Sequence, residues 1–246
     1  MRSLVAFLGV SLFVVVSLAA FAAAPAPAAS RAATTAVAIA YATADPNDAS
    51  GVVPRSASGR VVLDDRIARF RPSVRGLAIP IEGVALPTDP ELLPNAPREF
   101  RSGWHEGIDF PAPSGTAIHA VAAGTIVRID RDFQDWPREA KDLALDEAVK
   151  LGYTPSATHD RIRGRQVWID HGDGIVSRYA HLSAVADLAV GAVVERDMVV
   201  GLVGSSGYPE GGPHLHLEIR VGTSYLGEGL GGDALTAAVT AAFDSP

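Results

Sequence analysis

Three short segments of the 246-residue chain carry histidine and carboxylate side chains at spacings that suit metal chemistry. In the first of them, residues 213–221, polar residues alternate with apolar ones, which is typical of a β-strand with two unlike faces. We expect the apolar residues to enter the core, and His214, His216 and Glu218 to line the opposite face. Neighbouring imidazoles on that face would lie roughly 7 Å apart. This separation suits one metal ligand beside one acid-base group.

The second segment places His105 and Asp109 four residues apart. This spacing would fit one face of a helix, but Gly107 between them and a proline just after the segment favour extended or turning backbone. On such backbone the even spacing still puts both side chains on one side. Ile108 and Phe110 are then free to face the core.

The third segment ends in His181, just after a predicted strand. The chain has no cysteine, so a metal must be held by His, Asp or Glu. Two imidazoles and one carboxylate would leave a tetrahedral zinc ion one open position for water, as in catalytic zinc sites. Zinc lowers the pKa of water toward ~7, so one further imidazole suffices to take its proton and another to stabilise an oxyanion. The residues therefore predict amide hydrolysis at one zinc ion per chain.

These side chains require a small β domain to position them. From Gly76 onward, short apolar runs are broken by Gly, Pro and Asp-Gly, which predicts a mainly β fold with antiparallel sheets that form a groove. The expected strands are residues 125–129, 167–170, 175–179 and 199–203, with Asp173-Gly174 as the turn between the middle two. A helix starting at Pro137 and stopped by Gly152 is expected in the insertion 131–164, and a C-terminal helix at residues 233–243, capped by Asp233.

The start of the chain has the layout of a secretory leader. Arg2 precedes an apolar run from Leu4 to Ala24 and a Pro/Ala-rich stretch, so we expect a signal peptide at residues 1–28, cleaved after Ala22 or Ala28. The run is also close to the ~20 residues that span a bilayer, so an uncleaved membrane anchor is the alternative. Either outcome places the remainder outside the cytoplasm.

Composition divides the rest of the chain. Residues 29–75 form a low-complexity linker with a short helix expected at 61–70, residues 76–230 form the metallopeptidase domain, and residues 231–246 form a helical tail. The net charge is −7 with the acidic groups spread out, which argues against nucleic acid as a partner. The lack of cysteine excludes a lipoprotein anchor.

Several motifs in one order resemble the lysostaphin-like, or LytM-domain, zinc endopeptidases that cut peptides of bacterial peptidoglycan. The motifs are His-x-Gly-x-Asp (105–109), Pro-x-Gly-Thr (113–116), Ala-x-Gly-Thr-Ile-Val (122–127), Asp-His-Gly-x-Gly (170–174), Tyr-Ala-His-Leu-Ser (179–183) and Gly-Pro-His-Leu-His-Leu-Glu (212–218). The resemblance implies a LytM-type β-sandwich with a duplicated hybrid motif. It also implies that zinc binds His105, Asp109 and His216, that His181 and His214 take part in catalysis, and that the partner is a peptidoglycan peptide.

The chain departs from this family in the insertion 131–164, which bears on substrate selectivity. Two other functions remain open at this stage. Some relatives with this fold are catalytically silent modules that regulate other cell-wall hydrolases, although this chain keeps every expected ligand. Two histidines and one carboxylate also hold non-haem iron in oxygenases, which metal analysis would distinguish from zinc. The spacing alone does not decide which of His181 and His214 is the general base.

Overall fold

The computed structural model describes residues 74–244. The expected signal peptide, the linker up to residue 73 and the helix expected at residues 61–70 lie outside this range. No helix within residues 74–244 combines the length and apolar character needed to span a bilayer.

Twelve strands are formed within the described residues, and most of them are short. In chain order they are β1 (Pro97–Arg98), β2 (Gly103–Trp104), β3 (Ile108–Pro111), β4 (Ala117–His119), β5 (Gly124–Ile129), β6 (Val167–Asp170), β7 (Ile175–Ala180), β8 (Ala184–Val185), β9 (Val193–Val194), β10 (Val199–Leu202), β11 (His214–Val221) and β12 (Ser224–Tyr225). The four strands expected between residues 125 and 203, and the alternating segment 214–221, are all present.

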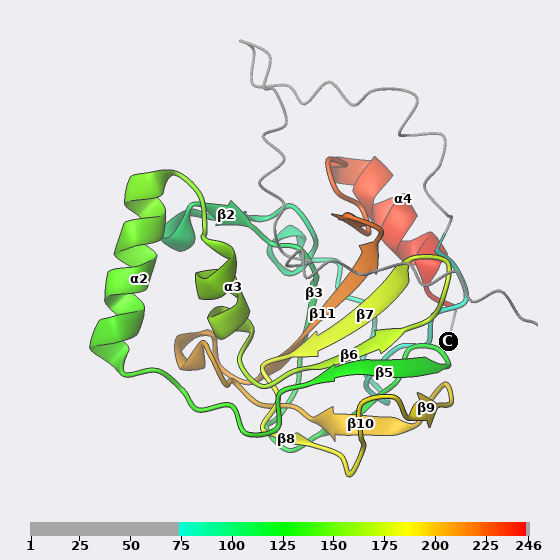
Figure 1. Cartoon of the computed structure of the whole chain (residues 1–246). Helices are drawn as coiled ribbons and strands as arrows, with labels where there is room; N and C mark the ends of the chain where they lie inside the picture. Colours follow the sequence, from blue (N-terminus) through cyan, green and yellow to red (C-terminus); the bar gives the residue numbers. More distant parts are fainter. Residues whose placement is uncertain (1–73, 245–246) are drawn as a thin grey trace, which may run out of the picture. The chain divides into compact units, whose positions relative to one another are not determined.

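The strands pair antiparallel in three sheets. A seven-stranded sheet has the order β12-β11-β7-β6-β5-β9, and β3 pairs with the first half of β11. A three-stranded sheet has the order β4-β10-β8, and β1 and β2 form a two-stranded ribbon. Figure 1 shows β11, β7, β6 and β5 running side by side, with β10 and β8 below them. The predicted mainly antiparallel β fold is confirmed.

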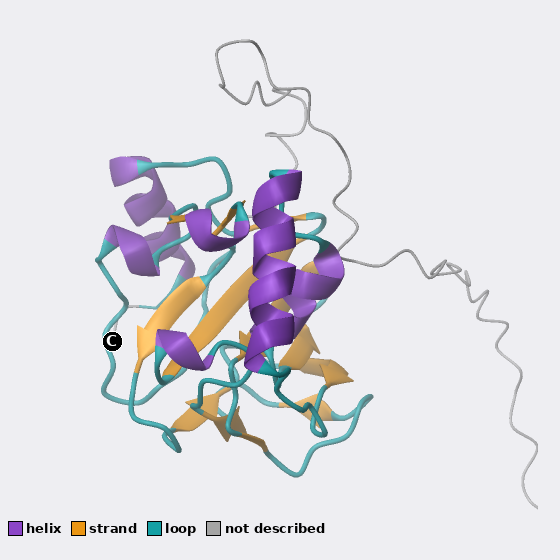
Figure 2. Ribbon diagram, turned by 90° about the vertical axis from the view of Figure 1, so that its left-hand side faces the viewer, coloured by secondary structure: helices purple, strands orange, loops and turns teal. Residues whose placement is uncertain are grey.

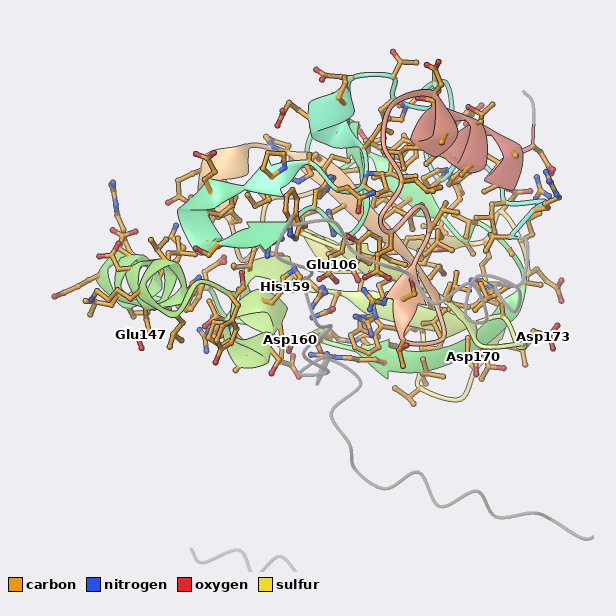
Figure 3. The ribbon with its side chains drawn as sticks, turned by 90° about the horizontal axis from the view of Figure 1, so that it is seen from above. Glu106, Glu147, His159, Asp160, Asp170 and Asp173 are labelled. Atoms are coloured by element: carbon orange, nitrogen blue, oxygen red, sulfur yellow. The ribbon has the colours of Figure 1, made fainter. Side chains whose placement is uncertain are left out.

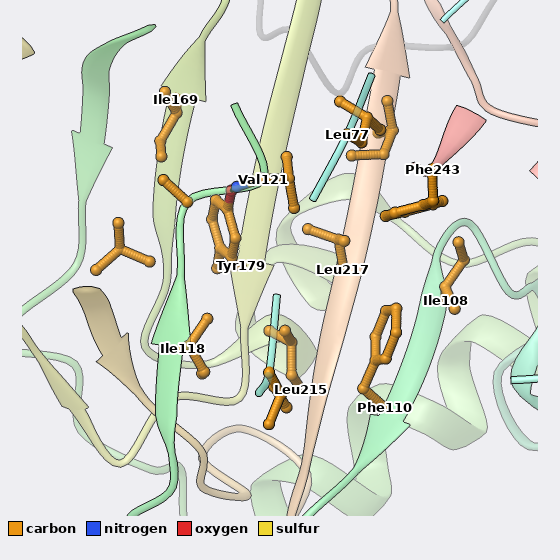
Figure 4. Close-up of a cluster of buried hydrophobic side chains, with 14 of the residues drawn as sticks. Leu77, Ile108, Phe110, Ile118, Val121, Ile169, Tyr179, Leu215, Leu217 and Phe243 are labelled. Atoms are coloured by element: carbon orange, nitrogen blue, oxygen red, sulfur yellow. The ribbon is translucent and has the colours of Figure 1, made fainter. Parts of the chain in front are cut away.

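The core lies where apolar side chains of these sheets meet. On β11, Leu215, Leu217 and Ile219 are buried, as the alternation predicts. Ile108 and Phe110 of the neighbouring strand β3 are buried beside them, and Figure 4 shows this cluster. Each such side chain contributes roughly 1.5–3 kcal/mol when fully buried. Burial of one face of β11 therefore fixes the direction in which its histidines point.

Within residues 74–244, three α-helices frame the sheets: α2 (Arg138–Leu151), α3 (Ser156–Arg163) and α4 (Gly232–Ala242). Figure 1 shows α2 and α3 at the end of the large sheet where β11 begins, and α4 toward its other end. In Figure 2, α2 stands in front of the sheet. Three short 3₁₀ turns complete the fold, namely η1 (Pro90–Leu92), η2 (Glu99–Arg101) and η3 (Pro209–Gly211).

The helices agree with the sequence in outline and differ in detail. Helix α2 ends at Gly152, whose φ of 75° provides the left-handed cap that favours glycine. Leu143 within this helix is 64% exposed, so this apolar residue does not mark a buried face. Helix α3 was not expected, because its eight residues are mostly polar. Helix α4 begins at Gly232, after Gly231 as N-cap, so the expectation that Asp233 caps it was wrong.

Candidate metal centre

Strand pairing brings the two histidine segments together. In the register of β11 against β3, His216 lies opposite Asp109 and Leu217 lies opposite Ile108. Because Leu217 and Ile108 enter the core, the side chains of His216 and Asp109 share the other face of the sheet. Two motifs 107 residues apart in the sequence therefore form one site.

His105 reaches this site from the loop before β3. Its Nδ1 donates a hydrogen bond to the Leu93 carbonyl at 2.8 Å, which fixes the ring. Gly107 allows the loop to pass close to β11, because a Cβ atom there would lie 2.6 Å from the Leu217 carbonyl oxygen and 2.9 Å from His216 Cε1. A glycine inside the His105–Asp109 motif is thus required by close backbone approach.

Three donor atoms converge at the centre of this arrangement. His105 Nε2 lies 3.0 Å from His216 Nδ1 and 3.0 Å from Asp109 Oδ1. His216 Nδ1 lies 2.8 Å from the same Asp109 oxygen. His105, Asp109 and His216 accordingly form a group whose ligand atoms are close enough to share one metal ion.

The hydrogen bonds on the far side of each ring indicate what this group can bind. His105 donates from Nδ1 to a carbonyl, and His216 Nε2 lies 3.3 Å from Oε1 of Glu218, so both rings can present a bare lone pair to the centre. Together with the carboxylate oxygen, three lone pairs then face one another, and a cation between them removes their repulsion. Tetrahedral zinc with ~2.0–2.1 Å bonds needs donors about 3.3 Å apart, so they must separate by only about 0.3–0.5 Å. The donor set fits zinc.

The protonation tendencies agree with a site built for positive charge. Burial alone would raise the pKa of Asp109, but the charges and hydrogen bonds of His105 and His216 hold it well below its usual value. Burial lowers the pKa of His105. Burial also opposes the charged form of His216, but hydrogen bonds to Asp109 and Glu218 outweigh it and raise the pKa to about 9. The surroundings of His216 therefore attract a cation.

Two further histidines, His181 and His214, face the same centre. Their rings are 4.7 Å apart between centroids, and the ring of His181 is 5.7 Å from that of His216. His181 donates from Nδ1 to the Ser206 carbonyl and His214 donates from Nδ1 to the Gly212 carbonyl, each at 2.9 Å. The Nε2 atom of each ring is consequently left as an acceptor, and that of His214 lies 3.8 Å from Asp109 Oδ1.

His181 is held in an uncommon state. Its backbone φ of 62° is in the left-handed region, which residues other than glycine rarely adopt. Such backbone conformations cluster at functional positions. Burial, followed by the neighbouring His214 and His216, lowers its pKa to about 3. His181 is therefore neutral at physiological pH and keeps a free acceptor nitrogen.

All five histidine and aspartate residues line one pocket of about 270 Å³. Its walls also include Phe100 and Tyr208, whose rings stack 5.1 Å apart. Three arginines line it as well, and Arg98 places Nη2 at 3.5 Å from Asp109 Oδ2. The other two are Arg101 and Arg163. The pocket thus offers a cationic wall beside the candidate metal ligands.

A second cluster of potential ligands, Glu106, His159 and Glu218, lies close by. Figure 3 shows Glu106 and His159 near each other, and their closest charged atoms are 3.8 Å apart. Arginines occupy this cluster, because Arg163 contacts both of its carboxylates and Arg220 Nη1 lies 2.7 Å from Glu106 Oε2. It is therefore a buried ion-pair network behind the candidate metal centre.

Comparison with known proteins shows that part of the chain is similar to a peptidase family. Residues 147–227 match the sequence model of Peptidase family M23, a range that includes His181, His214 and His216 and begins after His105 and Asp109. This segment of the chain is of the M23 peptidase type. The resemblance to LytM-type peptidases found in the sequence is thereby confirmed.

Curated relatives align with about half of this chain. The chain is 35% identical over 117 residues to the DD-carboxypeptidase/endopeptidase Mpg of Neisseria meningitidis, which covers 48% of this chain and 20% of that protein. It is 29% identical over 133 residues to the peptidoglycan DD-endopeptidase ShyA of Vibrio cholerae, covering 54% of this chain and 24% of that protein. The chain thus spans about a fifth to a quarter of the length of these relatives.

Solved structures with similar chains include the catalytic domain of EnpA, a prophage-encoded M23 protein from Enterococcus faecalis. It is 26% identical, covers 50% of this chain and 74% of its own, and has a TM-score of 0.35. Lysostaphin from Staphylococcus simulans is 24% identical, covers 56% of this chain and 45% of its own, and has a TM-score of 0.35.

The segment that matches the M23 model contains two further histidines, His171 and His159. His171 bonds to the Ala123 carbonyl and to Ser177 Oγ and does not line the pocket, which indicates a structural role. His159, which the sequence gave no reason to promote, does line the pocket. Its partners come from other segments, so no local spacing could have indicated its place.

Proposed function

We propose that this protein is a zinc-dependent endopeptidase that acts outside the cytoplasm on peptidoglycan stem peptides or cross-bridges. The observation that carries the proposal is the convergence of His105 Nε2, His216 Nδ1 and Asp109 Oδ1 within 2.8–3.0 Å of one another in the pocket of an M23 domain. The activities for which Mpg and ShyA are named support a cell-wall peptide as substrate.

The two further histidines supply acid-base chemistry in this proposal. When bound, zinc supplies Lewis acidity that acidifies water and polarises a peptide carbonyl. The carbonyls of Ser206 and Gly212 keep the Nδ1 protons of His181 and His214 pointing away from the pocket, so each Nε2 can accept a proton from water. Because a neutral ring offers only a lone pair at Nε2, the imidazole that stabilises the developing oxyanion must carry a proton on that atom. General base and oxyanion partner are thus drawn from the same pair.

The test is digestion of purified peptidoglycan by the full chain, with products identified by mass spectrometry. We expect new amino termini in the peptide fraction, loss of activity with a chelator, recovery with zinc, and no activity for His216→Ala. Metal analysis of the protein as isolated separates zinc from iron. Peptidoglycan left intact by protein that holds one zinc ion per chain would refute the enzymatic role and favour a silent regulatory module.

A further inference from the structure

The insertion 131–164 ends in an arginine that lies behind the candidate metal centre. Arg163, the last residue of α3, is only 2% exposed. Its Nε donates to Glu218 Oε1 at 2.6 Å, and the same oxygen lies 3.3 Å from His216 Nε2. A continuous chain of contacts therefore runs from the insertion through Glu218 to a candidate zinc ligand.

Glu218 depends on Arg163 for the orientation of this particular oxygen. The carboxylate is fully buried, and its other oxygen, Oε2, is contacted by Arg178 at 3.3 Å and by Arg220 at 3.7 Å. Oε1 itself is contacted by Arg163 Nε at 2.6 Å. Arg163 is thus the cation on the side that faces His216, where an ionised oxygen can accept the Nε2 proton.

The backbone at Arg163 also supports His181, one of the two candidate catalytic histidines. The carbonyl of Arg163 accepts a hydrogen bond from the His181 N–H at 2.8 Å. The following Gly164 packs so closely on Ser206 that a Cβ atom would lie 2.3 Å from its carbonyl oxygen. That carbonyl is the acceptor for His181 Nδ1. The end of the insertion therefore supports the backbone and the ring of His181 together.

From these contacts we propose that Arg163 is a positioning residue of the metal centre, which fixes the tautomer and orientation of His216 through Glu218. The inference rests on the proposed zinc function and assigns the insertion a part in it. Outer partners of ligating histidines are typically worth 10–100-fold in metal affinity. Arg163 of α3 thereby takes part in the site through Glu218, without being one of the proposed zinc ligands.

The experiment compares zinc affinity of full-length variants by competition with a chromogenic chelator, together with the melting temperature of the metal-free protein. Arg163→Met, of similar length but without charge, is expected to weaken zinc binding about 10–100-fold. Arg163→Lys keeps a cation beside Glu218 and should recover part of the loss. The matched control is Arg128→Met. Arg128 lies away from the pocket and donates two hydrogen bonds of 2.7–2.8 Å to Asp160 of α3, the helix that also carries Arg163. This control should lower the melting temperature and leave zinc affinity within about twofold.

A double variant distinguishes positioning through Glu218 from loss of folding. In a Glu218→Gln background a neutral amide replaces the buried carboxylate, so we expect the protein to tolerate the loss of Arg163, and Arg163→Met should then change zinc affinity by less than about threefold. Wild-type zinc affinity in Arg163→Met, or an equal loss in both backgrounds, would overturn the inference while the proposed function stands. Failure of the wild-type chain to bind zinc would overturn both.

Discussion

Gly107 tests how closely the candidate ligand segment is fitted against β11. A Cβ atom there would lie 2.6 Å from the Leu217 carbonyl oxygen and 2.9 Å from His216 Cε1, whereas ordinary contacts begin at 3.4 Å. In Gly107→Ala the loop before β3 must therefore move away from β11 by about 0.8 Å at the Leu217 carbonyl, and the His216 ring must move by about 0.5 Å. Metal-ligand distances tolerate only about 0.2 Å. We expect at least tenfold weaker zinc binding and a loss of about 1–3 kcal/mol in the free energy of unfolding of the metal-free protein.

The measurements are chelator competition for zinc and urea unfolding of the metal-free full chain. Gly231→Ala is the matched control, because a Cβ atom at Gly231 meets nothing within 4 Å and its φ of −147° is accessible to alanine. This control should keep wild-type zinc affinity and lose only about 0.5–1 kcal/mol through the poorer N-cap. Wild-type zinc affinity and stability in Gly107→Ala would refute the close packing described for this segment.

Three more predictions follow from the site and from α3. His181→Gln should bind zinc like wild type but lower kcat about 10²–10⁴-fold; an unchanged kcat on peptidoglycan would contradict its role. Free zinc at 100 times Kd should stabilise the chain by about 2.7 kcal/mol, read as a melting temperature that falls on chelation and recovers on zinc addition. Asp160→Asn should cost about 1 kcal/mol at pH 7 and a smaller amount near pH 2. Burial raises the pKa of Asp160, but Arg128 lowers it below 3.8, so the pair stabilises above that pH and is lost as the folded pKa is passed. An equal difference at both pH values in urea unfolding would contradict this.

The alternation of residues 214–221 was enough to predict strand β11 and the direction of its histidines. A period of two leaves a clear signal when one face is apolar. The alternation could not show that the polar face is buried as well: His216, Glu218 and Arg220 are all under 9% exposed. The residues that cover this face include Arg163, which lies 55 residues before Glu218 in the sequence. Ion pairs at such separations leave no periodicity in a sequence.

Helix α3 illustrates the other limit of the sequence. Its eight residues, Ser156–Arg163, contain few apolar side chains, and Pro155 before it suggests an end rather than a start. The helix is held by tertiary contacts instead, among them the burial of Ile162 and the ion pair of Asp160 with Arg128. The convergence of His105, Asp109 and His216 was predictable only through the family resemblance, since it depends on the register of β3 against β11.

The buried charges behind β11 are poorly explained as a source of stability. Removing ions such as Glu218 and Arg163 from water costs several kcal/mol each, and well-packed apolar replacements of buried ion pairs are often as stable or more stable. An apolar residue at position 218, however, could not accept the Nε2 proton of His216 and so could not hold its Nδ1 lone pair toward Asp109 and His105. The network therefore makes physical sense as the means of fixing a ligand tautomer, with the ionised state of Glu218 maintained by arginines from β7, β11 and the insertion.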